Sequence, residues 1–237
     1  MAHISISNLT AEFRIYGTSS RSLKMHVIAQ ATGGRLVPNS EAVTVRAIDN
    51  LSIEINDGDR IGLVGHNGSG KTTLLRVLSG IYMPSAGRIE ITGSVGTLLN
   101  ASAGMDPEST GIENIYLCGY VLGMRKQQIE AQIDDISEAS QLGDFLQLPV
   151  KTYSAGMAAR LAFAISTSAH NDILLIDEGI GAGDASFVDR AKKRINDLID
   201  RTSIVLVASH SEEIIKSLCN RRISMEHGKI IDDRRIA

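Results

Sequence analysis

The stretch RIGLVGHNGSGKTTLLRVLSG, residues 60–80, decides the fold of this chain. Its first part is apolar, its middle holds three glycines within six residues, and its last part is rich in leucine. This order predicts a buried strand, a tight loop and a helix. Residues 65–72 match the pattern G-x-x-x-x-G-K-[ST], in which glycine lets the backbone wrap closely and point its N–H groups inward. The stretch therefore predicts a loop that binds phosphate groups.

Two side chains complete the chemistry of this loop. Lys71 is placed to reach the outer phosphates of a nucleotide, and Thr72 to put its hydroxyl on Mg²⁺. A chance match to the pattern is expected on the order of one per cent of the time at average glycine usage. The flanking strand and helix patterns make an incidental glycine-rich turn the weaker interpretation.

Two further apolar runs end beside polar residues suited to the same chemistry. DILLID, residues 172–177, ends in Asp177, which is placed to support Mg²⁺. Glu178 follows, and successive side chains of an extended chain point to opposite faces, so Glu178 is free to polarise a water as general base. SIVLVA, residues 203–208, precedes His210, which can bond the γ-phosphate or the attacking water. The alternatives are acids that only cap a strand and a histidine with a structural role.

KTYSAGMAAR, residues 151–160, predicts the start of another helix. Ser154 is the expected N-cap, because its hydroxyl can accept from the free N–H groups of the first turn, and residues 157–169 then run apolar. A helix start of this kind is an anion site. The phosphate loop lies elsewhere in the chain, so this second site needs an anion of its own.

The remaining patterns predict an α/β fold with a mainly parallel sheet, because strands alternate with helices around short apolar runs. Outside the runs described above, strands are expected at residues 3–9 and 43–55. Residues 84–99 predict a hairpin or short strands, and residues 222–232 a closing hairpin. Residues 17–42 have a weak pattern and are interpreted as a weakly structured insertion with a short helix near its middle.

A helical subdomain is expected at about residues 100–168. Within it, KQQIEAQIDDISEASQL, residues 126–142, has isoleucine or leucine at positions that share one face of a helix. These positions are Ile129, Ile133, Ile136 and Leu142. The spacing predicts helical structure with a buried apolar face.

The composition of the chain limits the classes of function that it can have. The 237 residues carry a formal net charge of −3 with scattered basic residues, which gives no case for nucleic-acid binding. Cys118 and Cys219 form neither a metal-spaced cluster nor a disulfide framework, which favours a reducing compartment. The N-terminus does not have the pattern of a signal peptide, and no apolar run is long enough to span a bilayer. Work at a membrane would therefore need another chain.

Taken in order, GHNGSGKT, YSAGM, DILLIDE, GAGD and ASH resemble the motifs of ABC-transporter ATPase subunits, over residues 3–231. The resemblance implies a P-loop ABC ATPase fold with a parallel core, an antiparallel β subdomain and an inserted helical subdomain, as one nucleotide-binding domain over residues 1–237. It implies ATP and Mg²⁺ as ligands, with Lys71, Glu178 and His210 catalytic. The ATP-binding residues that it implies are Tyr16, Gly65, His66, Asn67, Gly68, Ser69, Gly70, Lys71, Thr72 and Thr73.

The resemblance also implies which anion the second helix start meets. In this family the signature loop faces the ATP held by a second subunit, so Ser154, Ala155 and Gly156 would contact the γ-phosphate in trans. Two copies of the chain would form a C2 homodimer around two ATP molecules. Asp184, in GAGD, would lie at the dimer interface.

Three features depart from the commonest family pattern. The signature is YSAGM where many members have Leu-Ser-Gly-Gly-Gln, although Ser154 and Gly156 remain. The Q-loop position holds Asn100, whose shorter side chain would reach Mg²⁺ through a water. An insertion follows the N-terminal strand, which makes Tyr16 the aromatic expected to stack on adenine; the alternative is a tyrosine packed at the end of an element.

YSAGMAARLAFAISTS, DEGIGAGDASF, RSLK and TGIENIYL resemble the ATPase subunits that export bacterial surface polysaccharides, O-antigen among them. This implies a lipid-linked polysaccharide as cargo and a separate transmembrane permease as partner. The permease would dock on residues 98–125 of this chain. The resemblance further implies that the chain lies at the cytoplasmic face of the inner membrane. The added carbohydrate-binding domain of some O-antigen exporters is expected to be absent. The alternatives are a subunit for capsule, teichoic acid or other solute export, a non-transport ABC ATPase and a nucleotide-binding regulator.

Overall fold

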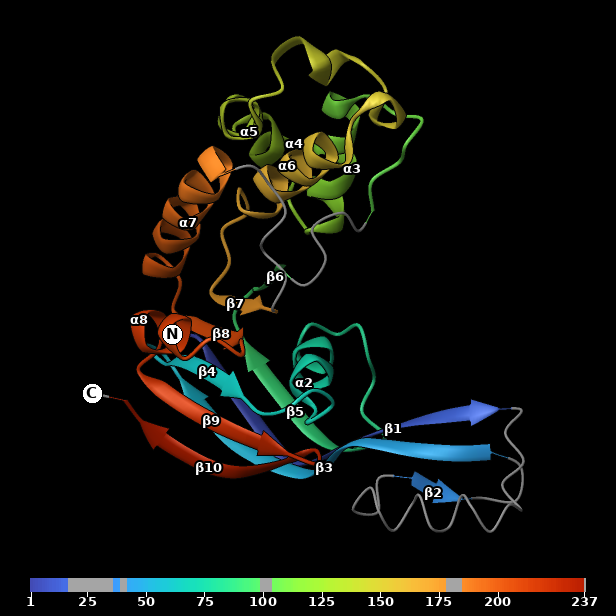
Figure 1. Ribbon diagram of the computed structural model, residues 1–237, viewed down its shortest axis with the longest axis vertical. Helices are drawn as coiled ribbons and strands as arrows, with labels where there is room; N and C mark the ends of the chain where they lie inside the picture. Colours follow the sequence, from blue (N-terminus) through green and yellow to red (C-terminus); the bar gives the residue numbers. More distant parts are fainter. Residues whose placement is uncertain (17–35, 39–41, 99–103, 178–184, 237) are drawn as a thin grey trace. The chain divides into compact units, whose positions relative to one another are not determined.

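The structure is a computed structural model that describes residues 1–16, 36–38, 42–98, 104–177 and 185–236 (Figure 1). The chain divides into two compact units. Unit 1 contains residues 1–93, 176–178 and 203–237, and unit 2 contains residues 94–175 and 179–202. The helix expected in the middle of residues 17–42 lies outside the described residues. Within the described ranges, no helix has the length and apolar character needed to cross a bilayer.

An antiparallel sheet forms one part of unit 1, with the order β2-β3-β1-β5 (Figure 1). In β1, Ile4 and Ile6 are buried, as the alternating pattern predicts. A bulge with left-handed Asn8 lets the strand continue beyond the predicted residue 9. The four strands are β1 (His3–Tyr16), β2 (Leu36–Pro38), β3 (Ala42–Asn56) and β5 (Ala86–Thr92).

The hairpin alternative for residues 84–99 is wrong, whereas the alternative of short strands is confirmed. β5 pairs with the distant β1, from His3 opposite Thr92 to Thr10 opposite Ala86, rather than with its sequence neighbour β6 (Val95–Leu98). β6 belongs to unit 2. The two segments share an alternating pattern but join different sheets, and the pattern of one segment does not identify its partner strand.

The second part of unit 1 is a sheet with the order β10-β9-β4-β8. Its strands are β4 (Arg60–Val64), β8 (Ile204–Ala208), β9 (Arg221–Glu226) and β10 (Lys229–Arg235). β4 pairs in parallel with both β8 and β9, which confirms the predicted parallel core. β9 and β10 form the predicted closing hairpin. Among its described residues, unit 1 also contains the helices α2 (Lys71–Leu78) and α8 (Glu212–Leu218).

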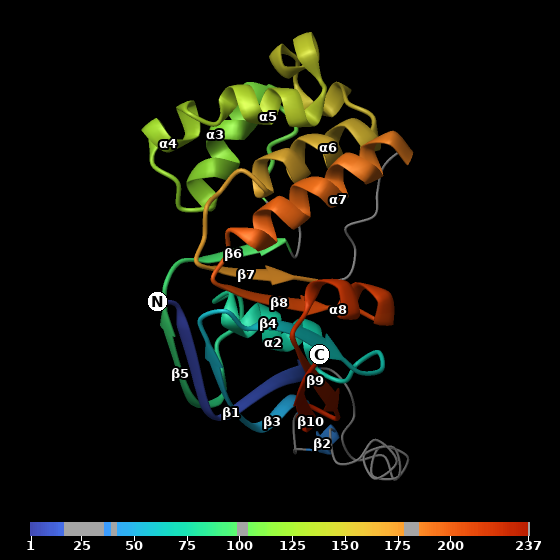
Figure 2. The same ribbon diagram turned by 90° about the vertical axis from the view of Figure 1, so that its left-hand side faces the viewer.

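Unit 2 is mainly helical (Figure 2). Beside β6 it contains β7 (Ile173–Ile176), whose last residue belongs to unit 1. Ile115, Ile129, Ile136 and Leu161 are fully buried at its core. Phe163 and Phe187 hold α6 against α7 through an edge-to-face contact with ring centroids 5.6 Å apart. The helices are α3 (Gly111–Val121), α4 (Lys126–Glu130), α5 (Ile133–Ser140), α6 (Ala155–Ser166) and α7 (Ala185–Asp200), with 3₁₀ turns η1 (Gly143–Gln147) and η2 (Val150–Thr152).

The helical structure predicted over residues 126–142 is confirmed, and it takes the form of two helices, because the helix is interrupted between α4 and α5. The N–H of Gln132 donates to the carbonyl of Ile129 at 2.9 Å, three residues back, which tightens the chain into a turn. Gln132 is the N-cap residue of α5. The predicted apolar face is nevertheless buried, because both short helices contribute it to one core.

The two cysteines are free thiols buried in different units. Burial raises the pKa of the Cys118 thiol, and it raises the pKa of the Cys219 thiol to about 12. Both thiols are therefore protonated at neutral pH and poorly nucleophilic.

Gly228, in the turn between β9 and β10, is expected to be intolerant of a side chain. Its φ is +78°, and a Cβ there would lie 2.7 Å from the carbonyl oxygen of Ala47. We expect Gly228→Ala to lower the free energy of unfolding by about 2–4 kcal/mol in a urea titration. Gly123 has a similar φ of +79°, and a Cβ there would meet no atom within 4 Å, so Gly123→Ala isolates the backbone strain. Equal losses in the two variants would contradict the contact with Ala47.

Candidate nucleotide-binding site

The segment between β4 and α2, residues 65–70, is the predicted phosphate loop, and its shape depends on contacts with β3. Gly70 has a φ of +113°, and a Cβ at this residue would lie 2.7 Å from the carbonyl oxygen of Ala47. Only glycine therefore fits where the loop enters the helix. α2 begins at Lys71, and its first N–H groups have no partner inside the helix. Free N–H groups at a helix start attract anions, and this helix start follows the end of a buried strand.

Lys71 brings a positive charge into this loop. The side chain is buried, and its ammonium donates to the carbonyl oxygens of Gly65 at 2.6 Å and His66 at 3.3 Å. These bonds hold the cation against the loop backbone beside the start of α2. A buried cation next to the positive end of a helix favours a polyanion. The geometry fits the outer phosphates of a nucleotide.

The β9–β10 hairpin also supports the loop. The N–H of Gly228 donates to the carbonyl of Ser69 at 2.8 Å, and the carbonyl of Gly228 accepts from the N–H of Asp49 at 3.0 Å. Sequence reasoning missed Gly228 as a residue that supports the site. The signal that could have found it is glycine at the turn of a predicted hairpin, although the turn itself does not reveal what the hairpin touches.

His210 and the start of the phosphate loop line one cavity of about 400 Å³ in unit 1. Gly65 and His66 contribute from the loop, and His210 from the segment after β8. Arg222, which also lines the cavity, forms a two-point ion pair with Glu212. The structure therefore brings together residues of two motifs that are 144 positions apart in the sequence, counted from His66 to His210.

Of the remaining predicted site residues, some lie within the described part of the chain and others lie outside it. Asp177 follows β7, belongs to unit 1 and is half-buried, as are Thr72 and Thr73. A hydroxyl and a carboxylate are oxygen ligands that suit Mg²⁺, and the hydroxyl of Ser69 is buried with no hydrogen-bond partner among the described residues. These donors fit a magnesium nucleotide. Glu178, Asn100 and Asp184 lie outside the described residues, as does the side chain of Tyr16.

The predicted N-cap of α6 is confirmed. Ser154 has an extended backbone, and its hydroxyl accepts from the N–H of Met157 at 3.2 Å. Ser154, Ala155 and Gly156 are all exposed. Their N–H groups and hydroxyl are thus open to a ligand or partner from outside unit 2.

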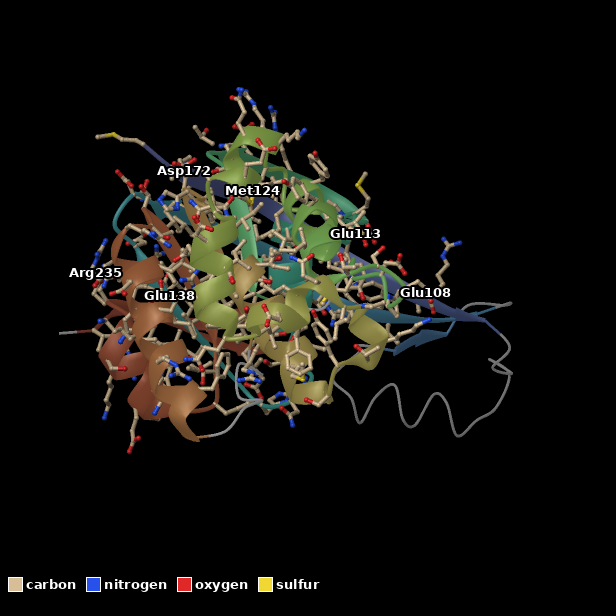
Figure 3. The ribbon with its side chains drawn as sticks, turned by 90° about the horizontal axis from the view of Figure 1, so that it is seen from above. Glu108, Glu113, Met124, Glu138, Asp172 and Arg235 are labelled. Carbon is tan, nitrogen blue, oxygen red and sulfur yellow. The ribbon has the colours of Figure 1, made fainter. Side chains whose placement is uncertain are left out.

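Tyr153 anchors the segment that precedes this helix start. Its hydroxyl donates to the carbonyl of Phe145 at 2.6 Å, and burial raises the pKa of the Tyr153 hydroxyl. Lys151, two residues earlier, is paired with Glu108, which Figure 3 labels. The exposed signature residues therefore project from a fixed segment.

Asn114 is a further residue that sequence reasoning missed. It is fully buried in α3, and its side chain accepts from the N–H of Asp106 at 2.7 Å. Its amide donates to the carbonyls of Asp106, Ser109 and Thr110. Asn114 thereby fixes the segment before α3. The capping box of Thr110 and Glu113 has the sequence pattern T-x-x-E, whereas a buried asparagine has no comparable pattern.

A family model described as ABC transporter matches residues 48–181. The O-antigen export system ATP-binding protein RfbE of Yersinia enterocolitica is 47% identical over 234 residues, which cover 98% of this chain and 98% of that protein. The teichoic acids export ATP-binding protein TagH of Lactococcus lactis subsp. lactis (strain IL1403) is 42% identical over 184 residues. These residues cover 78% of this chain and 39% of that longer protein.

Among solved structures, the ATP-binding cassette MJ0796, as a dimer in a post-hydrolysis state bound to ADP and Pi, is similar with a TM-score of 0.72. The match covers 99% of each chain at 16% sequence identity. At this identity the likeness describes the fold alone.

Proposed function

Because the chain belongs to the ABC transporter family, we propose that it is the ATP-hydrolysing subunit of an exporter for a lipid-linked surface polysaccharide. The polysaccharide that we favour is O-antigen. The observation that carries this proposal is the 47% identity to an O-antigen export ATP-binding protein over 98% of both chains. The chain works at the cytoplasmic face of the bacterial inner membrane, attached through a separate polytopic permease.

In ATP hydrolysis, some of the residues stabilise the negative charge of the phosphates and others position the water and accept its proton. Lys71 and the N–H groups at the start of α2 bind the outer phosphates. As the oxygen of water bonds to the γ-phosphorus, Glu178 accepts a proton from that water, and the bond to the bridging oxygen breaks to release ADP and phosphate. His210 orients the water or the γ-phosphate from the wall of the cavity beside the loop.

Mg²⁺ would supply positive charge to the phosphoryl oxygens when bound. Thr72 and Asp177 would hold it through a hydroxyl and a carboxylate, and Asn100 through a water. Tyr16 would stack on adenine. Thr73 and the backbone of the phosphate loop complete the nucleotide site.

The exposed helix start at Ser154 supports a homodimer in which each copy completes the other's site. Ser154, Ala155 and Gly156 are open at the N-terminus of α6, where a γ-phosphate held by a second copy would gain the helix dipole. Asp184 lies at the interface in this proposal. The dimer has C2 symmetry, so both sites are equivalent.

Mixing two inactive variants tests the trans arrangement. Lys71→Met removes the loop cation, and Ser154→Ala removes the signature hydroxyl, so each homodimer has two damaged sites. A mixed dimer has one intact site if Ser154 acts across the interface. We expect phosphate release from the mixture to rise well above that of either variant alone. Activity that stays at the level of the separate variants would place Ser154 in its own chain's site.

The permease would dock on the segment that includes α3. Leu117, Tyr120 and Val121 are exposed there, with 41%, 51% and 69% of their surface accessible. A group of exposed apolar side chains on one helix supports a protein contact. The proposed docking surface comprises residues 98–125.

The alternative cargo is capsule, teichoic acid or another solute, and the teichoic acids relative favours this possibility over a non-transport ABC ATPase. Lipid-linked glycan in cells that carry only Glu178→Gln separates these cargoes. If the cytoplasmic pool of polymer rises while surface polymer falls, the trapped polymer is the cargo. Cells with Glu138→Gln, an exposed change in α5, serve as control. If both glycan pools match those of the wild type, the polysaccharide cargo is wrong and the membrane partner has to be identified first.

A further inference from the structure

Three side chains from two segments of unit 1 converge beside the proposed nucleotide site, and two of them, His66 and Glu226, line the same cavity as His210. His66 comes from the phosphate loop, and Glu226 and His227 come from the β9–β10 turn. One ligand atom of each lies within 4.8 Å of the others, and the two imidazole rings have centroids 5.5 Å apart. We propose that this His66–Glu226–His227 cluster binds a divalent transition-metal ion of the zinc class.

The hydrogen bond of His66 indicates which ring nitrogen can bind the ion. Its Nδ1 lies 2.8 Å from the carbonyl oxygen of Asn67. A carbonyl oxygen only accepts, so Nδ1 carries the proton and Nε2 keeps its lone pair. Histidine ligands of metals usually donate their second N–H to a carbonyl or carboxylate in this way. The bond to Asn67 thus fixes both the tautomer and the orientation of the ring.

The turn places the other two ligands side by side. His227 has a φ of +49° and precedes Gly228 in a two-residue hairpin turn. Its Nε2 lies 3.8 Å from Oε1 of Glu226, and the two side chains are about half exposed, at 46% and 50%. The exposure gives an ion a path from solvent.

The backbone already holds the loop and the turn together. The N–H of Gly228 donates to the carbonyl of Ser69 at 2.8 Å, three residues after His66. Ligand atoms around tetrahedral zinc lie about 3.4 Å apart, so the distances of up to 4.8 Å in the cluster have to close by only a small rotation of exposed side chains. The site is therefore close to the geometry that the ion requires.

The ligand types of the cluster favour transition-metal ions over Mg²⁺. Two imidazoles and one carboxylate suit zinc, copper or nickel, whereas Mg²⁺ prefers oxygen ligands and keeps its waters. The Mg²⁺ that phosphoryl transfer requires would not compete for this cluster. Three protein ligands leave a coordination position for water. A bound ion would tie His66 of the phosphate loop to the hairpin.

The test is Zn²⁺ titration of the full-length chain without a histidine tag, by calorimetry in excess Mg²⁺ and without nucleotide, which itself chelates Zn²⁺. His227→Asn removes a ligand while keeping a residue that favours the left-handed turn, and Glu226→Gln keeps the shape of the carboxylate. His170→Asn removes an exposed histidine of unit 2 and is the matched control.

We expect one Zn²⁺ per wild-type chain and at least about tenfold weaker binding in both His227→Asn and Glu226→Gln. His170→Asn should bind like the wild type. Thermal melting without metal verifies that each variant is folded. Absence of binding by the wild type, wild-type affinity in His227→Asn, or an equal loss in His170→Asn would overturn the proposal in favour of adventitious surface binding. The readout is the binding of Zn²⁺, so it is independent of whether the chain drives polysaccharide export.

Discussion

Glu178→Gln is expected to bind ATP with wild-type affinity and to hydrolyse it about 10²–10⁴-fold more slowly. Glutamine keeps the size of the side chain but cannot accept the proton of the attacking water. The groups proposed to bind the phosphates, Lys71 and the start of α2, are unchanged. ATP binding is measured by calorimetry or with a fluorescent nucleotide, and hydrolysis by phosphate release at saturating ATP.

The control for this prediction is the same chemical change at an exposed site. Glu138 lies in α5 of unit 2 and is labelled in Figure 3. Glu138→Gln should leave both ATP binding and hydrolysis at wild-type levels. A turnover near that of the wild type in Glu178→Gln would remove Glu178 from the role of general base.

Lys71→Met is expected to weaken ATP binding by about 10–100-fold, because hydrogen bonds to a charged group contribute about 1.5–3 kcal/mol, and to abolish measurable hydrolysis. Methionine fits the buried stem of the lysine and forms helix readily, but it leaves the outer phosphates without their cation. The affected residue is 7% exposed and lies at the first position of α2. Binding is measured over a range of ATP concentrations that extends well beyond the wild-type Kd.

Lys216→Met gives the matched control, since Lys216 is exposed in α8. It should bind and hydrolyse ATP like the wild type. An unchanged ATP affinity in Lys71→Met would contradict the role of Lys71 in phosphate binding. The two active-site variants also differ from one another: only Glu178→Gln should retain nucleotide, so the pair separates the binding step from the chemical step.

The features that the sequence predicted correctly are those determined by a few neighbouring residues. The strand, loop and helix around Lys71 follow from apolar, glycine-rich and leucine-rich runs in sequence, and the N-cap at Ser154 follows from one hydroxyl before an apolar helix. The predicted P-loop ABC ATPase fold is confirmed by the likeness to solved cassettes, with TM-scores of 0.72 and 0.70.

The features that the sequence did not predict depend on contacts between distant segments. The extension of β1 beyond Leu9 depends on its pairing with β3, and the support of the phosphate loop depends on Gly228. The break after α4 is local, but the apolar spacing of residues 129–142 is the same for one helix or two. The cavity between His66 and His210 has no signal in either segment alone.

The bond between Gly228 and Ser69 has a consequence for biosynthesis. The phosphate loop is translated near residue 70, but the hairpin that supports it is translated 158 residues later, counted from Gly70 to Gly228. At 5–20 residues per second, the ribosome takes roughly 10–30 s to cover this distance. Both strands beside β4 also come from the last part of the chain. A nascent chain therefore acquires a supported nucleotide site only after the β9–β10 hairpin has been translated.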